Sequence, residues 1–371
     1  MAALLKSLVG ASEKSARIAQ LCRQEEALFQ LLIEEKTGTD KNKKFVQDFK
    51  TLADVLIQEV IKHDFPELHG HICGEESNQF ENKTLEVQVC ATQQDTASLL
   101  FTILDRNRPA AELLAAAIHQ EVVLQDPALD AVALAIPPER LAIWIDPIDS
   151  TNQYIRGQAC VAPIGGICPS GLRSALVLIG AYDRSSGDPV LGVINEPFFR
   201  EDPLTHRYLW QGVYHWGISY QGTSLSSLRR PPLCPKPSVV LSSSETPAIQ
   251  RALRPLYGER LRFVSGAGYK MLCVILGLAE AYILSEGSTF KWDSCAPHAI
   301  LRALGGGMVD LEAALQAWRA GQRGALPELT YHQPAGDAVG AERWANRGGL
   351  VAFMHREHLE LVMATLATAA L

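Results

Sequence analysis

The N-terminal part of the chain carries apolar residues at helical spacing. Between residues 15 and 35 they recur every three or four positions, which predicts an amphipathic helix. The same pattern predicts a second helix over residues 45–63, ended by a proline and a glycine that follow. Ser98–Leu104 and Ala110–Leu124 are also expected to be helical.

The middle of the chain has a different pattern, with short apolar runs separated by glycine and proline. Such runs are typical of strands and not of helices. We therefore expect sheet at Ile72–Cys73, Leu141–Ile145, Ala175–Ala181, Val190–Asn195 and Tyr208–Gln211.

The last third alternates short apolar strands with helical patterns, which indicates α/β layers. The proline-rich segment Ser224–Pro237 precedes it, so we expect an N-terminal half over 1–230 and a C-terminal half over 231–371. The expected elements are strands at Ser238–Leu241, Arg262–Val264, Ala281–Leu284, Gly307–Val309 and Leu350–Phe353, and helices at Ala248–Tyr257, Tyr269–Leu278, Cys295–Leu304 and Arg356–Ala369.

The overall composition narrows the possible partners. A net charge of −7 argues against a nucleic-acid partner, because no basic field would meet the phosphates. No apolar run is long enough to span a membrane, and charged residues follow the short apolar start at once, so we expect no signal peptide. The eight cysteines form no CxxC pair, which favours reduced thiols in a cytoplasmic protein.

The strongest chemical signal is Asp146-Pro147-Ile148-Asp149, at the end of an apolar strand. Pro147 restricts the backbone, so both carboxylates can turn to one side with the Ile148 carbonyl between them. These hard oxygen ligands suit Mg²⁺. The residues that follow, from Ser150, can open a helix whose free N–H groups face an anion. The pattern is equally typical of an Asp-Pro turn with an N-cap.

Three weaker acidic signals accompany it. Glu75 lies in a Gly-Glu-Glu turn, Asp293 precedes an apolar helix, and Asp54 lies one helical turn from Thr51. Each has an ordinary alternative, which is a solvated turn, a helix N-cap and a surface carboxylate respectively. Together they suggest an acidic cluster, although spacing alone does not show that they converge.

Taken in order, these motifs resemble the lithium-sensitive, magnesium-dependent phosphatase superfamily that includes inositol monophosphatase and fructose-1,6-bisphosphatase. That superfamily's pattern is a GEE turn, a strand ending in DPxD(G/S)T and a later WDxxAxxxIL segment. The resemblance implies an αβαβα sandwich, two or three Mg²⁺ ions, and inhibition by Li⁺ and Ca²⁺. The matching segments here are Gly74–Glu76, Asp146–Thr151 and Trp292–Leu301.

Within the superfamily the chain is most similar to enzymes that act on inositol polyphosphates. The features that carry this similarity are Asp48–Asp54, Ser150 in place of glycine, and Ser265–Lys270 before Phe290–Cys295. The similarity implies hydrolysis of the 1-phosphate of inositol 1,4-bisphosphate and inositol 1,3,4-trisphosphate by a metal-activated water.

The resemblance also implies roles for individual residues. One metal would be held by Glu75, Asp146 and the Ile148 carbonyl, and a second by Asp146, Asp149 and Asp293. Asp54 would pair with the Thr151 hydroxyl to deprotonate the water, and Glu75 would hold the metal that carries it. The implied substrate contacts are Asp149, Ser150, Thr151, Ser244, Thr246, Gly266, Ala267 and Lys270.

Two alternatives share these motifs. A 3′(2′),5′-bisphosphate nucleotidase belongs to the same class and would need an apolar slot for a purine. A protein that binds metal or phosphoinositide without catalysis would belong to another class. We expect a monomer that acts on a small molecule.

Overall fold

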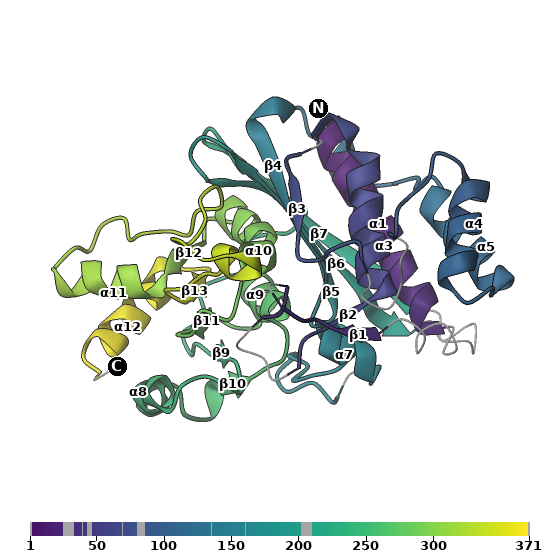
Figure 1. The fold of residues 1–371 in the computed structure, drawn as a ribbon. Coiled ribbons are helices and arrows are strands. Elements are labelled where there is room, and N and C mark those ends of the chain that lie inside the picture. Colours follow the sequence, from purple (N-terminus) through teal and green to yellow (C-terminus); the bar gives the residue numbers. More distant parts are fainter. Residues whose placement is uncertain are drawn as a thin grey trace.

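Two β-sheets alternate with three layers of helices, which gives an αβαβα sandwich (Figure 1). The fold class predicted from the sequence is therefore confirmed. The structure is a computed structural model that describes residues 2–24, 33–38, 40–42, 47–68, 70–79, 86–134, 136–159, 161–201 and 210–369.

The larger sheet has six strands in the order β3-β4-β5-β6-β7-β8. β3 runs parallel to β4, and every later neighbour is antiparallel. β4 and β5 are buried along their whole length, because helices cover both faces of the sheet. The strands are β3 Ile72–Gly74, β4 Leu141–Asp149, β5 Leu176–Asp183, β6 Pro189–Glu201, β7 Trp210–Tyr220 and β8 Thr223–Ser226.

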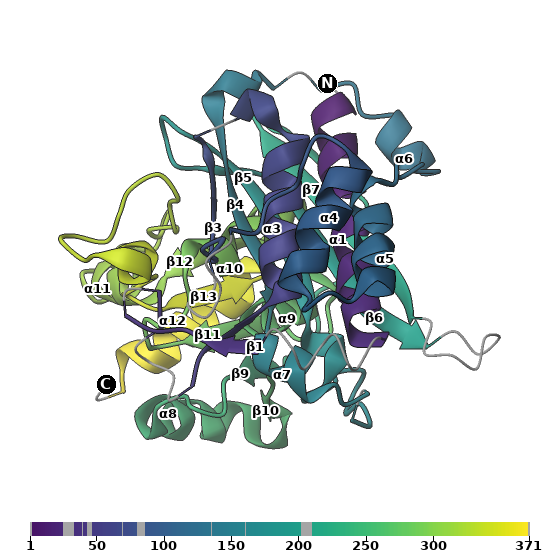
Figure 2. The same ribbon diagram turned by 45° about the vertical axis from the view of Figure 1, so that its right-hand side comes forward.

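Helices α1 (Ala2–Gln24) and α3 (Leu52–Asp64) cover one face of this sheet. Ile143 and Ile145 of β4 pack on this side. Figure 2 shows α4 (Gln93–Ile103) and α5 (Arg108–His119) on the outside of α1 and α3. The remaining elements here are α6 Pro127–Asp130, a small antiparallel sheet of β1 Ile33–Glu35 and β2 Phe49–Thr51, and short 3₁₀ turns at Pro66–Leu68, Pro138–Arg140 and Leu172–Ser174.

The central layer consists of α9 (Ala267–Ile275) and α10 (Lys291–Ala303). On β4 the alternating residues Ala142 and Trp144 face this layer, as the two-residue period of a strand requires. The short helix α7 (Thr151–Arg156) follows β4 directly.

The second sheet has five strands in the order β10-β9-β11-β13-β12 and packs on the other side of α9 and α10. Three helices cover its outer face. The elements are β9 Val239–Leu241, β10 Leu261–Phe263, β11 Ala281–Leu284, β12 Gly307–Asp310, β13 Leu350–Phe353, α8 Pro247–Tyr257, α11 Leu311–Arg319, α12 Arg356–Ala367, and 3₁₀ turns at Gly258–Arg260 and Gly340–Trp344.

Helix α10 lies directly on the backbone of the large sheet, at three glycines. A Cβ at Gly180 would lie 2.5 Å from the Ala296 nitrogen, and one at Gly217 would lie 2.8 Å from the Ile300 Cα. A Cβ at Gly192 would overlap the Ala296 carbonyl oxygen. These glycines therefore fix how closely α10 approaches the sheet.

Most predicted elements of the C-terminal half are confirmed within two or three residues, apart from the start of α10, while the N-terminal half holds more differences. The helix predicted over 15–35 is α1, but Ile33–Glu35 form strand β1. The helix predicted over 45–63 is also wrong at its start, where Phe49–Thr51 form β2 before α3. The helix predicted over Ala110–Leu124 ends at His119, so its last five predicted residues are not helical. Residues 25–32, 43–46 and 208–209 of the predicted segments lie outside the described part.

Other predictions concerned cysteines and membranes. Six described cysteines are free thiols, but Cys168 is disulfide-bonded, so the expectation of eight reduced thiols is wrong at this position. None of the described helices is long and apolar enough to cross a bilayer. The predicted boundary after residue 230 falls between β8 and β9, the last strand of one sheet and the first of the other.

The glycine contacts of α10 give a stability prediction. Gly192→Ala should lower the free energy of unfolding by about 1–3 kcal/mol, because the new methyl group overpacks against α10. The matched control is Gly10→Ala in α1, where nothing lies within 4 Å and the gain should be about 0.5–1 kcal/mol. Urea denaturation of both variants tests this. Equal effects of the two changes would contradict the packing argument.

Candidate metal centre and active site

The two aspartates of the strongest motif lie on one side of β4 because the strand contains a bulge. Where β4 pairs with β5, Asp146 lies opposite Leu178 and Asp149 opposite Leu176, so β4 has one extra residue. Residues three apart on a regular strand face opposite sides, and the extra residue reverses this. Pro147 lies in the bulge, where its missing N–H costs the ladder little.

Asp293 joins them from the first turn of α10. Its carboxylate accepts a 2.5 Å hydrogen bond from the Phe290 N–H in a capping-box geometry. Asp293 is therefore not the predicted N-cap, because Phe290 holds that position and Asp293 is the third residue of the helix, but the bond fixes its carboxylate in place. One carboxylate oxygen from each of Asp146, Asp149 and Asp293 lies within 4.8 Å of the others.

This cluster has the properties of a cation site. The three residues are only 1%, 5% and 8% exposed, and Asp146 Oδ1 has no hydrogen-bond partner among the described residues. Burial raises the pKa of Asp146, and repulsion from Glu75, Asp149 and Asp293 raises it further. Burial likewise raises the pKa of Asp293. Buried carboxylates that repel one another are neutralised either by protons or by a cation, and an all-oxygen donor set suits Mg²⁺.

Glu75 lies beside the cluster because β3 pairs with β4. Gly74 is opposite Ile145, and the Glu75 N–H donates to the Ile145 carbonyl at 3.2 Å, which places Glu75 next to Asp146. The side-chain amide of Gln58 from α3 holds the backbone of the following Glu76, because its NH₂ donates to the Glu76 carbonyl and its oxygen accepts from the Glu76 N–H. One cleft of 510 Å³ is lined by all the predicted ligands, which are Glu75, Asp146, Asp149, Asp293 and, for its carbonyl, Ile148.

No role was predicted for Lys36 from the sequence. Its side chain is buried, and its ammonium lies 2.5 Å from Glu75 and 2.6 Å from Glu76, with Asp48 at 3.7 Å. Burial alone would lower the pKa of Lys36, but these carboxylates hold it well above its usual value. A lysine in a basic loop carries no local signal of such a role, because the contacts join residues far apart in sequence.

The predicted base, Asp54, is 1% exposed, so the alternative of a surface carboxylate is wrong. Its carboxylate accepts hydrogen bonds from the Thr51 N–H at 2.7 Å and the Thr51 hydroxyl at 2.6 Å. Burial raises its pKa to about 7. The Thr151 hydroxyl donates to the Ile148 carbonyl at 3.1 Å, and no hydrogen bond joins Thr151 to Asp54 in the described structure.

Ser150 stands where the superfamily pattern allows glycine, and the backbone shows why. Its φ is 72°, in the left-handed region that side chains disfavour. This conformation ends β4 and starts α7 within one residue, which brings Thr151 directly to the cleft beside Asp149.

All the predicted substrate contacts except Thr246 line the cleft. Ser244, Gly266, Ala267 and Lys270 line the cleft, and so do Ser150 and Thr151. Thr246 is not among the described residues that line it. Its hydroxyl instead caps α8 by accepting from the Ile249 N–H at 3.4 Å. Beside it, the buried Glu245 accepts from Ser285 and so holds this loop against the end of β11.

The Lys270 side chain makes its contacts inside the protein. It is 4% exposed and so is not a solvated lysine. Its ammonium donates to the carbonyls of Gly266 at 2.8 Å and Val264 at 3.2 Å, and it lies 5.1 Å from the centre of the Tyr282 ring. Burial lowers its pKa to about 8, although Asp149 opposes this shift.

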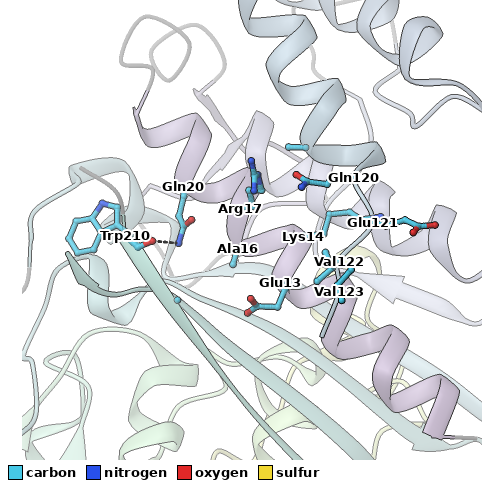
Figure 3. Close-up of a pocket in the computed structure, with 12 residues that line it drawn as sticks. Glu13, Lys14, Ala16, Arg17, Gln20, Gln120, Glu121, Val122, Val123 and Trp210 are labelled. Carbon is cyan, nitrogen blue, oxygen red and sulfur yellow. Dashed lines mark hydrogen bonds between the residues drawn. The ribbon is translucent and has the colours of Figure 1, made fainter. Parts of the chain in front are cut away.

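A second hollow lies far from the predicted residues, between α1, the segment after α5 and the start of β7 (Figure 3). Its volume is 360 Å³, and Glu13, Arg17, Gln120 and Trp210 contribute to its walls. None of the predicted site residues lines it. The acidic cleft is therefore the candidate active site.

The fold and this acidic cleft together define a class of protein. The sequence matches the inositol monophosphatase family over residues 5–358, and the chain belongs to that family. Inositol monophosphatase II of Staphylococcus aureus has a similar fold, with a TM-score of 0.51 at 14% identity over 98% of this chain and 93% of its own. The extragenic suppressor protein suhB of Bartonella henselae gives a TM-score of 0.53 at 14% identity over 99% of both chains.

Particular relatives are more similar in sequence. Human inositol polyphosphate 1-phosphatase is 47% identical over 99% of this chain and 97% of its own length. The Bos taurus enzyme of the same name is 49% identical over the same shares. Human 3′(2′),5′-bisphosphate nucleotidase 1 is more distant, at 25% identity over 70% of this chain and 79% of its own.

The raised pKa values predict how the metal-free protein depends on pH. The pKa values of Asp54 and Asp149 are about 7 and about 6, above the ordinary value of 3.8. The folded state therefore keeps protons that the unfolded chain has released, so these groups lower stability as pH rises through this window. In a chelator, the urea midpoint should be higher at about pH 5.5 than at about pH 8, and Mg²⁺ should raise the midpoint at pH 8.

Two matched variants test whether the acidic cluster causes this dependence on pH. Asp146→Asn removes one of the repelling charges, so the difference between the two midpoints should shrink. Asp337→Asn, at an exposed position, should leave the difference unchanged. A difference that persists fully in Asp146→Asn would contradict the assignment.

Proposed function

We propose that this chain is a Mg²⁺-dependent, lithium-inhibited phosphomonoesterase that removes the 1-phosphate of inositol 1,4-bisphosphate and inositol 1,3,4-trisphosphate. The observation that carries the proposal is the buried cluster of Asp146, Asp149 and Asp293 at the start of α7. Relatives with nearly half of their residues identical over almost the whole chain, named inositol polyphosphate 1-phosphatase, support the choice of substrate.

We expect the carboxylates to hold two or three Mg²⁺ ions. Glu75, Asp146 and the Ile148 carbonyl would form one site, and Asp146, Asp149 and Asp293 a second. Bound magnesium would neutralise the phosphate, lower the pKa of a water molecule and stabilise the leaving alkoxide. Such oxygen-only ligands also suit Li⁺ and Ca²⁺, which we expect to inhibit.

Asp54 and Thr151 are the candidates for moving the proton of the attacking water. Burial raises the pKa of Asp54 to about 7, so its carboxylate can accept a proton at neutral pH. The Thr151 hydroxyl now donates to Ile148, and it would turn from this carbonyl to orient the water.

The remaining contacts would orient the substrate. Backbone N–H groups at Ser150 and Thr151 would bind phosphate oxygens, and the wall formed by Ser244, Gly266 and Ala267 would face the inositol ring. The Lys270 ammonium donates two of its three N–H groups to backbone carbonyls, so one N–H remains for substrate. A cytoplasmic location and a monomeric state, expected from the sequence, remain predictions.

A phosphate-release assay tests the proposal against the nucleotidase alternative. Inositol 1,4-bisphosphate should be hydrolysed with Mg²⁺ and not in a chelator, and adenosine 3′,5′-bisphosphate should be a much poorer substrate. The more distant nucleotidase relatives make this comparison necessary. A preference for the nucleotide would sink the proposal, and no turnover of either would favour the non-catalytic alternative.

A single variant tests the proton-transfer role. Asp54→Asn should lower kcat by ~10²–10⁴-fold with little change in KM, because general-base assistance is lost. The chain offers a close control in Asp95→Asn, since Asp95 has the same capping relationship with Thr92 at the exposed start of α4. This control should keep full activity. A change in KM alone would make Asp54 a binding residue.

A further inference from the structure

Helix α7 presents a polar stripe to the active-site cleft. Asn152, Gln153 and Arg156 all line it, and their spacing of three and four residues places them on one face of the helix. The roles discussed above use the first turn of this helix, beside the metal ligands. They leave Arg156, in the last turn, without a function.

Arg156 is placed away from the acidic cluster but within the same cleft. It is five residues beyond Thr151, which is about 7.5 Å along a helix axis. Its side chain is exposed, and none of the described residues provides its guanidinium with a hydrogen bond or an ion pair. A guanidinium has five N–H donors in a fixed fork that matches phosphate oxygens.

The charges that line the cleft show why Arg156 matters for an anionic substrate. Its walls contain five carboxylates, Asp48, Glu75, Asp146, Asp149 and Asp293. Among the described lining residues, only Arg156 and Lys270 are cations, and Lys270 is already engaged by two carbonyls and Asp149. A phosphate group held away from the metals therefore meets in Arg156 a cation whose donors are all free among the described contacts, whereas Lys270 has one N–H left.

The backbone beneath Arg156 is held in place. Gly157 ends α7 with a φ of 63° and donates to the Gln153 carbonyl at 3.1 Å. Arg23 from the end of α1 donates to the Ile155 carbonyl at 3.3 Å and occupies the space where a Gly157 side chain would lie. On the other side, Gln153 accepts from the Gly171 N–H at 2.9 Å. These contacts hold in place the helix backbone that carries Arg156.

We propose that Arg156 binds the phosphate group of the substrate that is not hydrolysed, and so favours inositol bisphosphates over inositol monophosphates. The proposal rests on the function proposed above and adds a specificity-determining residue to it. Paired hydrogen bonds from the guanidinium to this phosphate would supply the discrimination. The ordinary alternative is a solvated arginine that interacts only with the C-terminal end of the helix dipole.

The test compares two substrates on matched variants. For Arg156→Gln, kcat/KM for inositol 1,4-bisphosphate should fall ~10- to 100-fold, the range for a charge-assisted hydrogen bond. The loss for inositol 1-phosphate, which lacks the second phosphate, should stay within about threefold, the scale of an exposed charge effect. Arg156→Lys should recover part of the loss, because it keeps the charge without the fork.

Product inhibition supplies an independent readout. Inositol 4-phosphate keeps the second phosphate, so its inhibition constant should rise about tenfold in Arg156→Gln, whereas that of inorganic phosphate should not change. Arg251→Gln, an exposed arginine on α8 outside the cleft, removes the same charge and should leave all these values unaltered.

The outcomes separate the two proposals. Equal losses on both substrates, or an unchanged inhibition constant for inositol 4-phosphate, would overturn the role of Arg156. Wild-type protein that fails to hydrolyse inositol 1,4-bisphosphate would overturn the proposed function itself. Thermal denaturation of each variant, with an unchanged midpoint expected for this exposed side chain, shows that any loss of activity is not a loss of folding.

Discussion

The active site depends on keeping mutually repelling carboxylates together away from water. Asp146, Asp149 and Asp293 are buried within 4.8 Å of one another, which burial and Coulomb repulsion both oppose. The protein offsets part of this cost with fixed positive groups. Lys36 neutralises Glu75 and Glu76 at one end, and Lys270 with the Gly268 N–H faces Asp149 at the other. Asp146 lies between these two ends without such a positive group, and this is where a cation is needed.

The layered fold is what brings these charges together. The bulged end of β4 and the first turn of α10 meet in the layer between the two sheets, and β3 adds Glu75 by pairing with β4. The glycines beneath α10 set the depth of that helix, so they also set the distance of Asp293 from the sheet. The cleft wall that contains Ser244, Gly266 and Ala267 comes from loops at the ends of β9 and β10, which belong to the other sheet.

The fold class and the residues that line the cleft could be predicted from the sequence. The contacts that these residues make with other side chains and carbonyls could be predicted less well. Motifs such as Asp146–Asp149 carry their geometry locally, because proline and a strand end restrict the backbone there. Lys36 and the β1–β2 pairing could not be predicted, because they depend on contacts between segments whose own patterns look helical or polar. The inward orientation of Lys270 was equally hidden, since it is decided by the carbonyls of Val264 and Gly266.

The placement of the metal ligands has a consequence for the lifetime of the protein in a cell. A cation bound among them would join β4 to α10, and so would act as a non-covalent cross-link that closes the chain between Asp149 and Asp293 into a loop. Ligands that bind only the folded state reduce the population open to proteases. The turnover of this protein would then follow the supply of the bound cation, so that loss of the ion would lower the amount of the protein.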